Sequence, residues 1–410
     1  VYLRYSFRLE PTPGQRIALA RTFGCARVVY NDALATRKAA YLADRSKIAT
    51  GVLAKRVITD AKKTPERVWL AEVSVDALQS SLRDLDAAYA NFFASVSGKR
   101  PGRRMGLPVF KSKKDSRQAI RFSRNGFRLR DNGRLNLAKI GDVRVRWSRS
   151  LPSVTVLKDS SGRYFASFVV QVEPEPLAPV TSEVGIDLGL THYAVLSDGQ
   201  VIDNPRFLRR AERRLRKAQQ VLSRKVKGSK NRAKARLKVA RAHARVADTR
   251  RNWCHQSASR LVRDNQAVYL EDLAVSGLAR TRLAKSVHDA AWGMFRRVLE
   301  EKAARHGRHV GVVSRWLPSS QTCSVCWVVD GKKPLHVRIW RCDGCGTEHD
   351  RDLNASRVIL AAGQAERVNA PGGPVSPGVE IPRQARLVER GTHPKAQPVT
   401  TGSQAGIPAL

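Results

Sequence analysis

The chain has 410 residues, which is long enough for two or three domains that each bury a hydrophobic core. It carries 75 Lys and Arg residues against 35 Asp and Glu residues, a formal net charge of +40. So large an excess of one sign repels itself unless a polyanion neutralises it, so the composition predicts a nucleic-acid partner. We find no apolar run of membrane-spanning length and no N-terminal signal peptide, which argues against a membrane protein.

The N-terminal part predicts a short strand at residues 1–9 followed by helices. Pro13-Gly14 precedes an amphipathic stretch that begins at Gln15. A second helix is indicated by apolar residues spaced by three and four, namely Val75, Leu78, Leu82, Leu85, Tyr89 and Phe92. Cys25 lies in an apolar helical stretch, and we interpret it and the isolated Cys254 as buried structural thiols.

Residues 95–127 are rich in Gly, Pro and basic residues, with Phe110, Phe122 and Phe127 interleaved. Such a segment suits neutralisation of a phosphate backbone, and the rings could either stack on bases or belong to the core. The candidate nucleic-acid contacts here are Arg103, Arg104, Lys111, Lys113, Lys114 and Arg121. Residues 128–172 then read as short β-strands, and the proline-rich residues 173–182 as a linker between domains.

The second half begins with three predicted strands in a meander, at residues 183–188, 193–196 and 200–202, with a hairpin turn at Asp198-Gly199. Residues 206–251 hold nineteen Lys or Arg residues against two acids and show two apolar seams. They predict a helical hairpin with a cationic outer face. The candidate nucleic-acid contacts on it are Arg213, Arg216, Lys217 and Arg224.

Further strands are predicted at residues 267–270 and 309–316, with one helix at residues 286–306 between them. A short helix is expected over about residues 354–362. Residues 363–410 contain seven prolines and little periodicity, and we expect a disordered tail.

Four of the six cysteines form two CxxC pairs, Cys323 with Cys326 and Cys342 with Cys345, separated by fifteen residues. Two such pairs point four thiolates at one tetrahedral ion, so we expect structural Zn²⁺. A redox CxxC would be single, and four thiolates leave no open position for catalysis. His349 is expected on the surface or beside the site rather than as a ligand, because four cysteines already fill the site.

Three acids are candidate metal ligands. Asp187 lies in an apolar strand, where an unpaired carboxylate is costly, Glu271 ends another apolar strand, and Asp352 begins a helix. Together they could hold two Mg²⁺ ions for phosphodiester cleavage. Taken singly, Asp187 could merely end a strand, Glu271 could pair with nearby arginines, and Asp352 could cap a helix.

The ordered motifs GIDLGL (185–190), LEDL (270–273), SSQTCSVC (319–326), CDGC (342–345) and DRDLNAS (350–356) resemble the TnpB (OrfB) proteins of insertion sequences, which are related to type V CRISPR effector nucleases. The resemblance extends to PTPGQ (11–15), GLPVFK (106–111) and HDAAWGMF (288–295), so it covers nearly the whole chain. Trp327 departs from the family pattern, in which Gly is commoner after the second cysteine. Asp350 competes with Asp352 for the third acidic position, and the match favours Asp352 because it lies two residues before Asn354.

The resemblance implies a mixed α/β multidomain fold. A β-barrel wedge domain (residues 1–10 and 95–172) would carry a helical recognition lobe (residues 11–94). A RuvC-like, RNase H-type nuclease domain (residues 183–316 and 346–362) would contain an inserted zinc-binding module (residues 317–345) that contacts the target nucleic acid.

The implied activity is RNA-guided, Mg²⁺-dependent cleavage of double-stranded DNA beside a transposon-adjacent motif, with Asp187, Glu271 and Asp352 as catalytic metal ligands. The partners would be a guide RNA from the transposon end, one protein per RNA, and target DNA, in the prokaryotic cytoplasm. The oligomeric state stays open. The alternatives are a transposase that joins DNA strands itself and a DNA-binding regulator without guided cutting.

Overall fold

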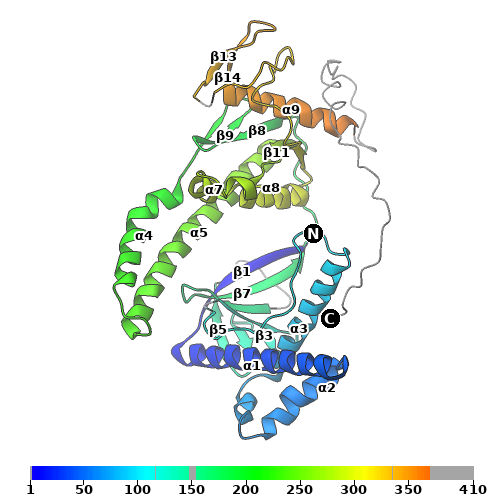
Figure 1. The fold of residues 1–410 in the computed structure, drawn as a ribbon, viewed down its shortest axis with the longest axis vertical. Coiled ribbons are helices and arrows are strands. Elements are labelled where there is room, and N and C mark those ends of the chain that lie inside the picture. Colours follow the sequence, from blue (N-terminus) through cyan, green and yellow to red (C-terminus); the bar gives the residue numbers. More distant parts are fainter. Residues whose placement is uncertain (1, 116, 147–153, 335, 370–410) are drawn as a thin grey trace. The chain divides into compact units, whose positions relative to one another are not determined.

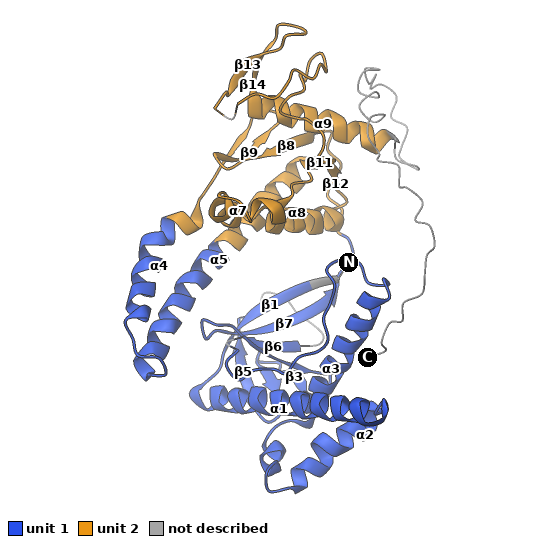
Figure 2. Cartoon of the chain, in the orientation of Figure 1, with its two compact units in different colours: residues 1–174, 210–249 blue, residues 175–209, 250–410 orange. Residues whose placement is uncertain are grey.

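The computed structural model describes residues 2–115, 117–146, 154–334 and 336–369. The predicted tail beyond residue 369 therefore lies outside the described residues. The chain divides into two compact units, one of residues 1–174 and 210–249 and one of residues 175–209 and 250–410 (Figure 2). Within the described ranges, no helix has the length and apolar character needed to cross a membrane.

The first unit contains a seven-stranded antiparallel sheet that curls into a nearly closed barrel, in the order β2-β6-β7-β1-β5-β4-β3. Its strands are β1 (Tyr2–Glu10), β2 (Gln118–Phe122), β3 (Phe127–Leu129), β4 (Leu135–Leu137), β5 (Gly141–Val145), β6 (Val154–Lys158) and β7 (Tyr164–Gln171). The N-terminal strand β1 lies at the centre, paired along its whole length with β7. Alternating apolar residues such as Phe7, Leu9, Phe122 and Phe168 fill the interior.

Helices are inserted between β1 and β2 (Figure 1). They are α1 (Pro13–Asp44), α2 (Thr50–Ala54), η1 (Lys55–Asp60), η2 (Ala61–Lys63), η3 (Val68–Glu72) and α3 (Val75–Val96). Thr12 and Gln15 form a capping box at the start of α1, with Pro13 as the first helical residue. The predicted apolar stripe is present on α3 and packs against α1. Cys25 is buried there, as predicted, and desolvation raises its pKa to about 11.

The second unit is built on a five-stranded sheet in the order β10-β9-β8-β11-β12. The predicted meander is confirmed as β8 (Glu183–Leu188), β9 (His192–Leu196) and β10 (Val201–Asp203). The strands β11 (Ala267–Glu271) and β12 (His309–Val313) run parallel to β8. Strand β12 ends three residues earlier than the sequence indicated.

One face of this sheet packs on a helical layer, and the other is covered by α9 (Arg351–Asn369). Two glycines permit the close approach of α9. A Cβ added at Gly185 would lie 2.1 Å from the backbone oxygen of Ser356, and one at Gly363 would lie 2.2 Å from the ring of Tyr269. The sequence-based end of this helix at residue 362 was therefore wrong. Gly363 is a packing position inside the helix, not the beginning of the tail.

The helical layer differs from the prediction in two places. The expected helix at residues 286–306 is divided into α7 (Ala284–Ala290) and α8 (Trp292–His306) at Ala291, which adopts a left-handed φ of 56°. A four-residue helix, α6 (Val275–Leu278), precedes them. The basic hairpin is present as α4 (Phe207–Ser223) and α5 (Lys230–Asp264), but α5 continues past residue 251 because Cys254, Ala258, Leu261 and Val262 belong to the core of the second unit.

The buried carboxylate of Asp289, in α7, fixes the root of this hairpin. It accepts hydrogen bonds from the backbone N–H groups of Leu208 and Arg209 at the start of α4, at 2.7 and 3.2 Å. It also pairs with Arg250 of α5 at 3.0 Å. The negative charge therefore satisfies the free N–H groups of one helix and holds the second beside it.

Candidate active site and metal centre

The sheet of the second unit places two carboxylates on one face at one edge. Because β8 and β11 are parallel neighbours, with Ile186 opposite Leu270, their carboxyl ends meet. Side chains alternate along each strand, so Ile186 and Leu270 enter the core while the residues after them point to the face that α9 covers. Those next residues are Asp187 and Glu271.

Asp187 lies half-buried where the strand leaves the core. Burial, together with the charges of Asp352 and Glu271, raises its pKa from 3.8 to about 7, although Arg351 and Arg338 act in the opposite direction. Among the described residues, neither Asp187 nor Glu271 makes a side-chain hydrogen bond or ion pair. Two carboxylates without partners, close to a third, fit the hard oxygen ligands that Mg²⁺ prefers.

The adjacent acids Glu271 and Asp272 have separate environments. Asp272 is bound by Arg296, at 2.9 Å, and by Arg315, and both arginines hold its pKa below the usual range. Burial raises the pKa of Glu271, and the neighbouring Asp272 adds to the rise. The nearby arginines thus neutralise Asp272 and leave Glu271 available.

The acids at the start of α9 are divided in the same way. The carboxylate of Asp350 accepts hydrogen bonds from the backbone N–H groups of Asp352 and Leu353, at 3.1 and 2.9 Å, and so caps the helix. Asp352 stands in the first turn, free of the capping role, and raises the pKa of Asp187.

Arg338 of the cysteine module reaches this edge. Its guanidinium contacts both carboxylate oxygens of Asp352, at 3.1 and 3.2 Å, and the hydroxyl of Thr191 at 3.4 Å. This contact was not identified from the sequence, because nothing in the local pattern around Arg338 relates it to Asp352.

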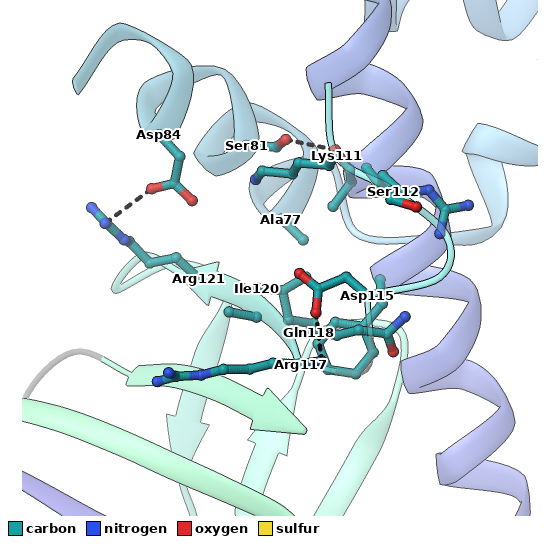
Figure 3. A pocket seen from close by; sticks show the side chains of 14 residues that line it. Ala77, Ser81, Asp84, Lys111, Ser112, Asp115, Arg117, Gln118, Ile120 and Arg121 are labelled. Carbon is teal, nitrogen blue, oxygen red and sulfur yellow. Dashed lines mark hydrogen bonds and ion pairs between the residues drawn. The ribbon is translucent and has the colours of Figure 1, made fainter. Parts of the chain in front are cut away.

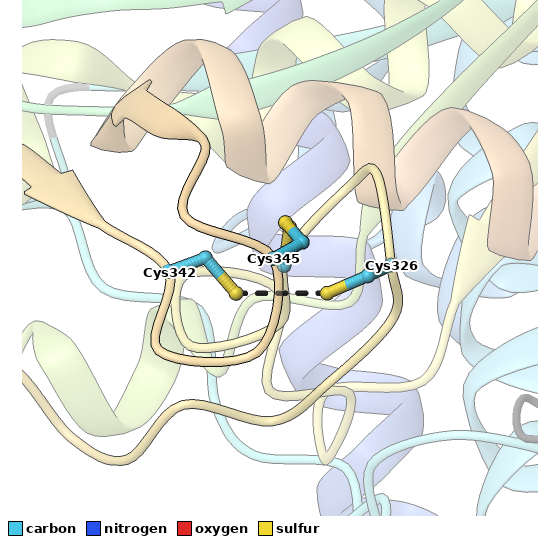
Figure 4. A group of neighbouring side chains, drawn as sticks. Cys326, Cys342 and Cys345 are labelled. Atoms are coloured by element: carbon cyan, nitrogen blue, oxygen red, sulfur yellow. Dashed lines mark hydrogen bonds between the residues drawn. The ribbon is translucent and has the colours of Figure 1, made fainter.

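The four cysteines converge, and Figure 4 shows how Cys326, Cys342 and Cys345 face one another. Their Sγ atoms all lie within 4.8 Å of one another, and the pairs Cys323–Cys345 and Cys326–Cys342 are separated by 3.7 and 3.6 Å. Four sulfurs at roughly 2.3 Å from a tetrahedral Zn²⁺ would lie about 3.8 Å apart. The cluster therefore fits a structural zinc ion. Within the described part of the chain, it is the one group of three or more His, Cys, Asp or Glu side chains whose ligand atoms already lie close enough together to hold a metal ion.

Residues around the cluster agree with its role as a structural site. His349 is buried, with its Nε2 atom 3.0 Å from the Sγ atom of Cys323 and its ring against Trp340, so it lies beside the thiolates as expected. Trp327, the departure from the family pattern, adopts a left-handed φ of 65°, a conformation that favours glycine.

The cysteine module is also joined to the start of α9, where Asp352 stands. The buried side chain of Asn354 accepts a hydrogen bond from the backbone of Ser324 at 2.8 Å and donates one to the backbone oxygen of Thr322 at 2.7 Å. The backbone N–H of Arg351 binds the oxygen of Arg338 at 2.7 Å. A folded module therefore supports the position of the third acid.

Two of the candidate nucleic-acid contacts of the first unit, Lys111 and Arg121, line a pocket of about 210 Å³ between α1, α3 and residues 111–121 (Figure 3). Lys111 lies 4.0 Å from the ring of Tyr30, and Arg121 pairs with Asp84 at 2.9 Å. The other predicted contacts there, Arg103, Arg104, Lys113 and Lys114, are exposed.

Of the interleaved aromatic residues, Phe122 is fully buried and Phe127 packs against the barrel core, so they do not stack on bases. Phe110 is 53% exposed, with Lys38 over its ring. Arg213, Arg216, Lys217 and Arg224 are all exposed on α4 or just after it.

A larger hollow of about 860 Å³ in the first unit was not anticipated. Arginines from β1, α1, the end of β5, the turn before β7 and α5 line it, namely Arg8, Arg16, Arg146, Arg163, Arg241 and Arg245. Glu10 and Asp248 line it as well and pair with Arg146 and Arg163. Burial and the charges of Arg163 and Arg146 lower the pKa of Arg8, although Asp159 and Glu10 act in the opposite direction. The lining carries more cations than acids, which suits an anionic ligand.

Comparison with known proteins agrees with these features. A family model described as "Probable transposase" (OrfB of IS605) matches residues 167–282, a "Cas12f1-like, TNB domain" matches residues 292–359, and a "Helix-turn-helix domain" of OrfB matches residues 1–46. A "Putative RNA-guided DNA endonuclease" of Streptomyces pristinaespiralis is 44% identical over 414 residues, covering 99% of this chain and 98% of that protein. The Escherichia coli K12 protein of the same description, InsQ, is 31% identical, covering 88% and 92%.

Among solved structures, the Cas12f1 chain of a complex with guide RNA and target DNA superimposes with a TM-score of 0.50 at 13% identity, covering 84% of this chain and 82% of that one. That likeness concerns the fold. The class is thus a mixed α/β protein with a RuvC-like unit that bears a four-cysteine module. The chain belongs to the TnpB (OrfB) family.

Proposed function

We propose that this chain is an RNA-guided DNA endonuclease of an insertion sequence, which cuts double-stranded DNA beside a transposon-adjacent motif. The observation that carries the proposal is the meeting of Asp187 and Glu271 on one sheet edge, close enough to Asp352 for the three charges to interact. Membership in a family whose curated relatives are named RNA-guided DNA endonucleases supports it.

Asp187, Glu271 and Asp352 would hold two Mg²⁺ ions. When bound, such a pair supplies an activated water and stabilises the leaving oxygen of a phosphodiester. The residues of the chain create the conditions for this. The edge of the sheet fixes two carboxylates, and Asp350 and Asp272 bind the helix N–H groups and the arginines Arg296 and Arg315. Bound Mg²⁺ would favour the charged form of Asp187, which burial disfavours.

The remaining parts have proposed roles that follow from their position. Residues 1–10 and 95–172 would form the wedge domain, residues 11–94 the recognition lobe, residues 173–182 a linker, and residues 183–316 with 346–369, to the end of α9, the nuclease domain. Residues 317–345 would form a zinc module that contacts target nucleic acid. The exposed cations of residues 103–121 and of α4 would neutralise the backbones of guide RNA and DNA.

The proposal is tested by expressing the protein in a bacterial cytoplasm together with the DNA that flanks its gene, then sequencing the RNA that co-purifies. We expect one defined RNA per protein. The loaded protein should cut a plasmid that matches the RNA when Mg²⁺ is present and leave it intact in EDTA. Absence of bound RNA, or strand-joined products in place of cut ends, would favour a transposase.

A further inference from the structure

Trp316 is the most exposed large apolar side chain for which the described structure gives a value, with 85% of its surface accessible. Several other aromatic residues of the second unit belong to its core. Tyr193 packs on Trp253 and on Phe295, and Tyr269 is fully buried. Trp316 belongs to none of the core clusters of the described residues, so its exposed indole does not contribute to core packing.

The local backbone presents the ring rather than leaving it loose. The backbone N–H of Trp316 binds the hydroxyl of Ser314 at 3.3 Å, and the N–H of Leu317 binds the oxygen of Ser314 at 3.0 Å, which closes a turn directly after β12. Leu317 packs with Val313 and Ile359 in the small core under α9. The turn is therefore anchored on both sides of Trp316.

The turn lies at the carboxyl edge of the sheet that holds the acids (Figure 2). Val313, the last residue of β12, pairs with Glu271. Arg315, the residue directly before Trp316, binds the carboxylate of Asp272. From β12 to β8, which carries Asp187, there are two strand spacings, about 10 Å. That distance corresponds to about three nucleotides stacked at roughly 3.4 Å each.

We propose that Trp316 stacks on a base of the DNA strand that enters the acidic centre, and so positions that strand for cutting. The proposal rests on the proposed nuclease function. A nucleobase is favoured over a protein partner because the ring is a single presented aromatic residue beside a phosphodiester-cleaving edge, in a chain of net charge +40. Aromatic side chains hold single strands by stacking, without regard to sequence.

The first test uses the full-length protein with its guide RNA and single-turnover cleavage of matching DNA. Trp316→Ala should cut on the order of ten- to a hundredfold more slowly, whereas Trp316→Phe keeps most of the rate. Leu177→Ala, which removes an apolar side chain that is 36% exposed in the proposed linker of residues 173–182, is the matched control and should cut at the wild-type rate. An unchanged rate in Trp316→Ala would overturn the proposal.

DNA substrates with a single abasic position then separate stacking from a general defect. An abasic nucleotide at one position within about three nucleotides of the cut should slow the wild-type protein and have no further effect on Trp316→Ala. If the loss of rate from Trp316→Ala and the loss of rate from the abasic nucleotide multiply at every position tested, Trp316 does not contact a base.

A second measurement does not depend on cutting. The Asp187→Asn protein is mixed with single-stranded DNA that contains bromodeoxyuridine, irradiated, and digested for mass spectrometry. A cross-link to the peptide of Trp316 supports the proposal even if the wild-type protein fails to cut. Cross-links confined to other peptides count against it even if the wild-type protein cuts well, so the two failures are distinguishable.

Discussion

The cysteine cluster and the acidic centre are both candidate metal sites in one unit, yet they are assembled in opposite ways. The cysteines come from a short stretch of chain, and their sulfurs already lie at the spacing of a tetrahedral site. The acids come from β8, β11 and α9, and Arg338 is bound to Asp352. A closed site fixes structure, whereas an open site keeps ligands free for substrate-dependent chemistry.

The acidic centre also shows how neighbouring acids are assigned different roles. In each of two adjacent groups, one carboxylate is held within its own part of the fold and the other is directed to the centre. Arginines hold Asp272 and helix N–H groups hold Asp350, while Glu271 has no side-chain partner among the described residues and Asp352 binds only Arg338 of the cysteine module.

The largest effect on the cleavage rate is expected from removing one of the carboxylates that belong to the acidic centre. Glu271→Gln should lower the rate of Mg²⁺-dependent cleavage on the order of a thousandfold, because it removes a metal ligand and leaves the fold intact. Asp272→Asn, one residue away, should cost less than about tenfold and mainly lower the melting temperature, because its ion pairs are partly exposed. Single-turnover cleavage and thermal melting of both variants provide the check. Equal losses of rate would contradict the division of roles.

The next effect concerns the closed site. Cys342→Ser should reduce bound zinc from about one ion per chain to near none, since three sulfurs and a hydroxyl hold Zn²⁺ poorly. Cleavage should fall about ten- to a hundredfold, because the module supports Asn354 and, through it, the start of α9. Metal analysis by mass spectrometry is the measurement, and Cys25→Ser is the control that keeps its zinc. A zinc-free variant that cuts normally would show that the two sites are independent.

A smaller effect is expected at the contact between the two sites. Because the guanidinium of Arg338 binds both oxygens of Asp352, it competes with a cation there. Arg338→Gln should therefore tighten Mg²⁺ binding to the protein without nucleic acid by about two- to fivefold, the range expected for a partly exposed ion pair. Titration calorimetry measures this. Arg341→Gln, whose guanidinium binds only a backbone oxygen of its own turn, should leave the affinity unchanged.

The smallest effect is on stability. In the metal-free chain the pKa of Asp187 is raised from 3.8 to about 7, so the folded state keeps a proton that the unfolded state releases. Stability should accordingly fall as the pH rises from about 4 to 7 and then level off. Asp187→Asn lacks this dependence and should melt a few degrees higher than the wild type at pH 8 in EDTA. A wild-type melting temperature that is flat over this range would contradict the burial of the group.

The sequence predicts the zinc site more completely than the acidic centre, because the ligands of the first are close along the chain and those of the second are not. The zinc ligands are close along the chain, and their spacing alone defines the site. Asp187 and Glu271 were identifiable because a carboxylate in an apolar strand is costly, but only the parallel pairing of β8 and β11 brings them to one face.

Other features depend on contacts that no local pattern encodes. In the sequence, Gly363 indicates the end of a helix. In the structure, its missing side chain leaves room for the ring of Tyr269 against α9. Two long-range contacts could not be predicted from the local sequence of either partner. They are the contact of Arg338 with Asp352 and that of Asp289 with the start of α4. The break at Ala291 likewise interrupts a pattern that reads as one helix.

The central claim is that Asp187, Glu271 and Asp352 form the cutting centre of an RNA-guided nuclease. It is tested most directly by loading the wild type and Asp187→Asn with the same RNA and measuring binding and single-turnover cleavage of matching double-stranded DNA in Mg²⁺. We predict that both proteins bind the RNA and the DNA with similar affinity and that only the wild type cuts. Cleavage by Asp187→Asn at a rate near that of the wild type would contradict the account.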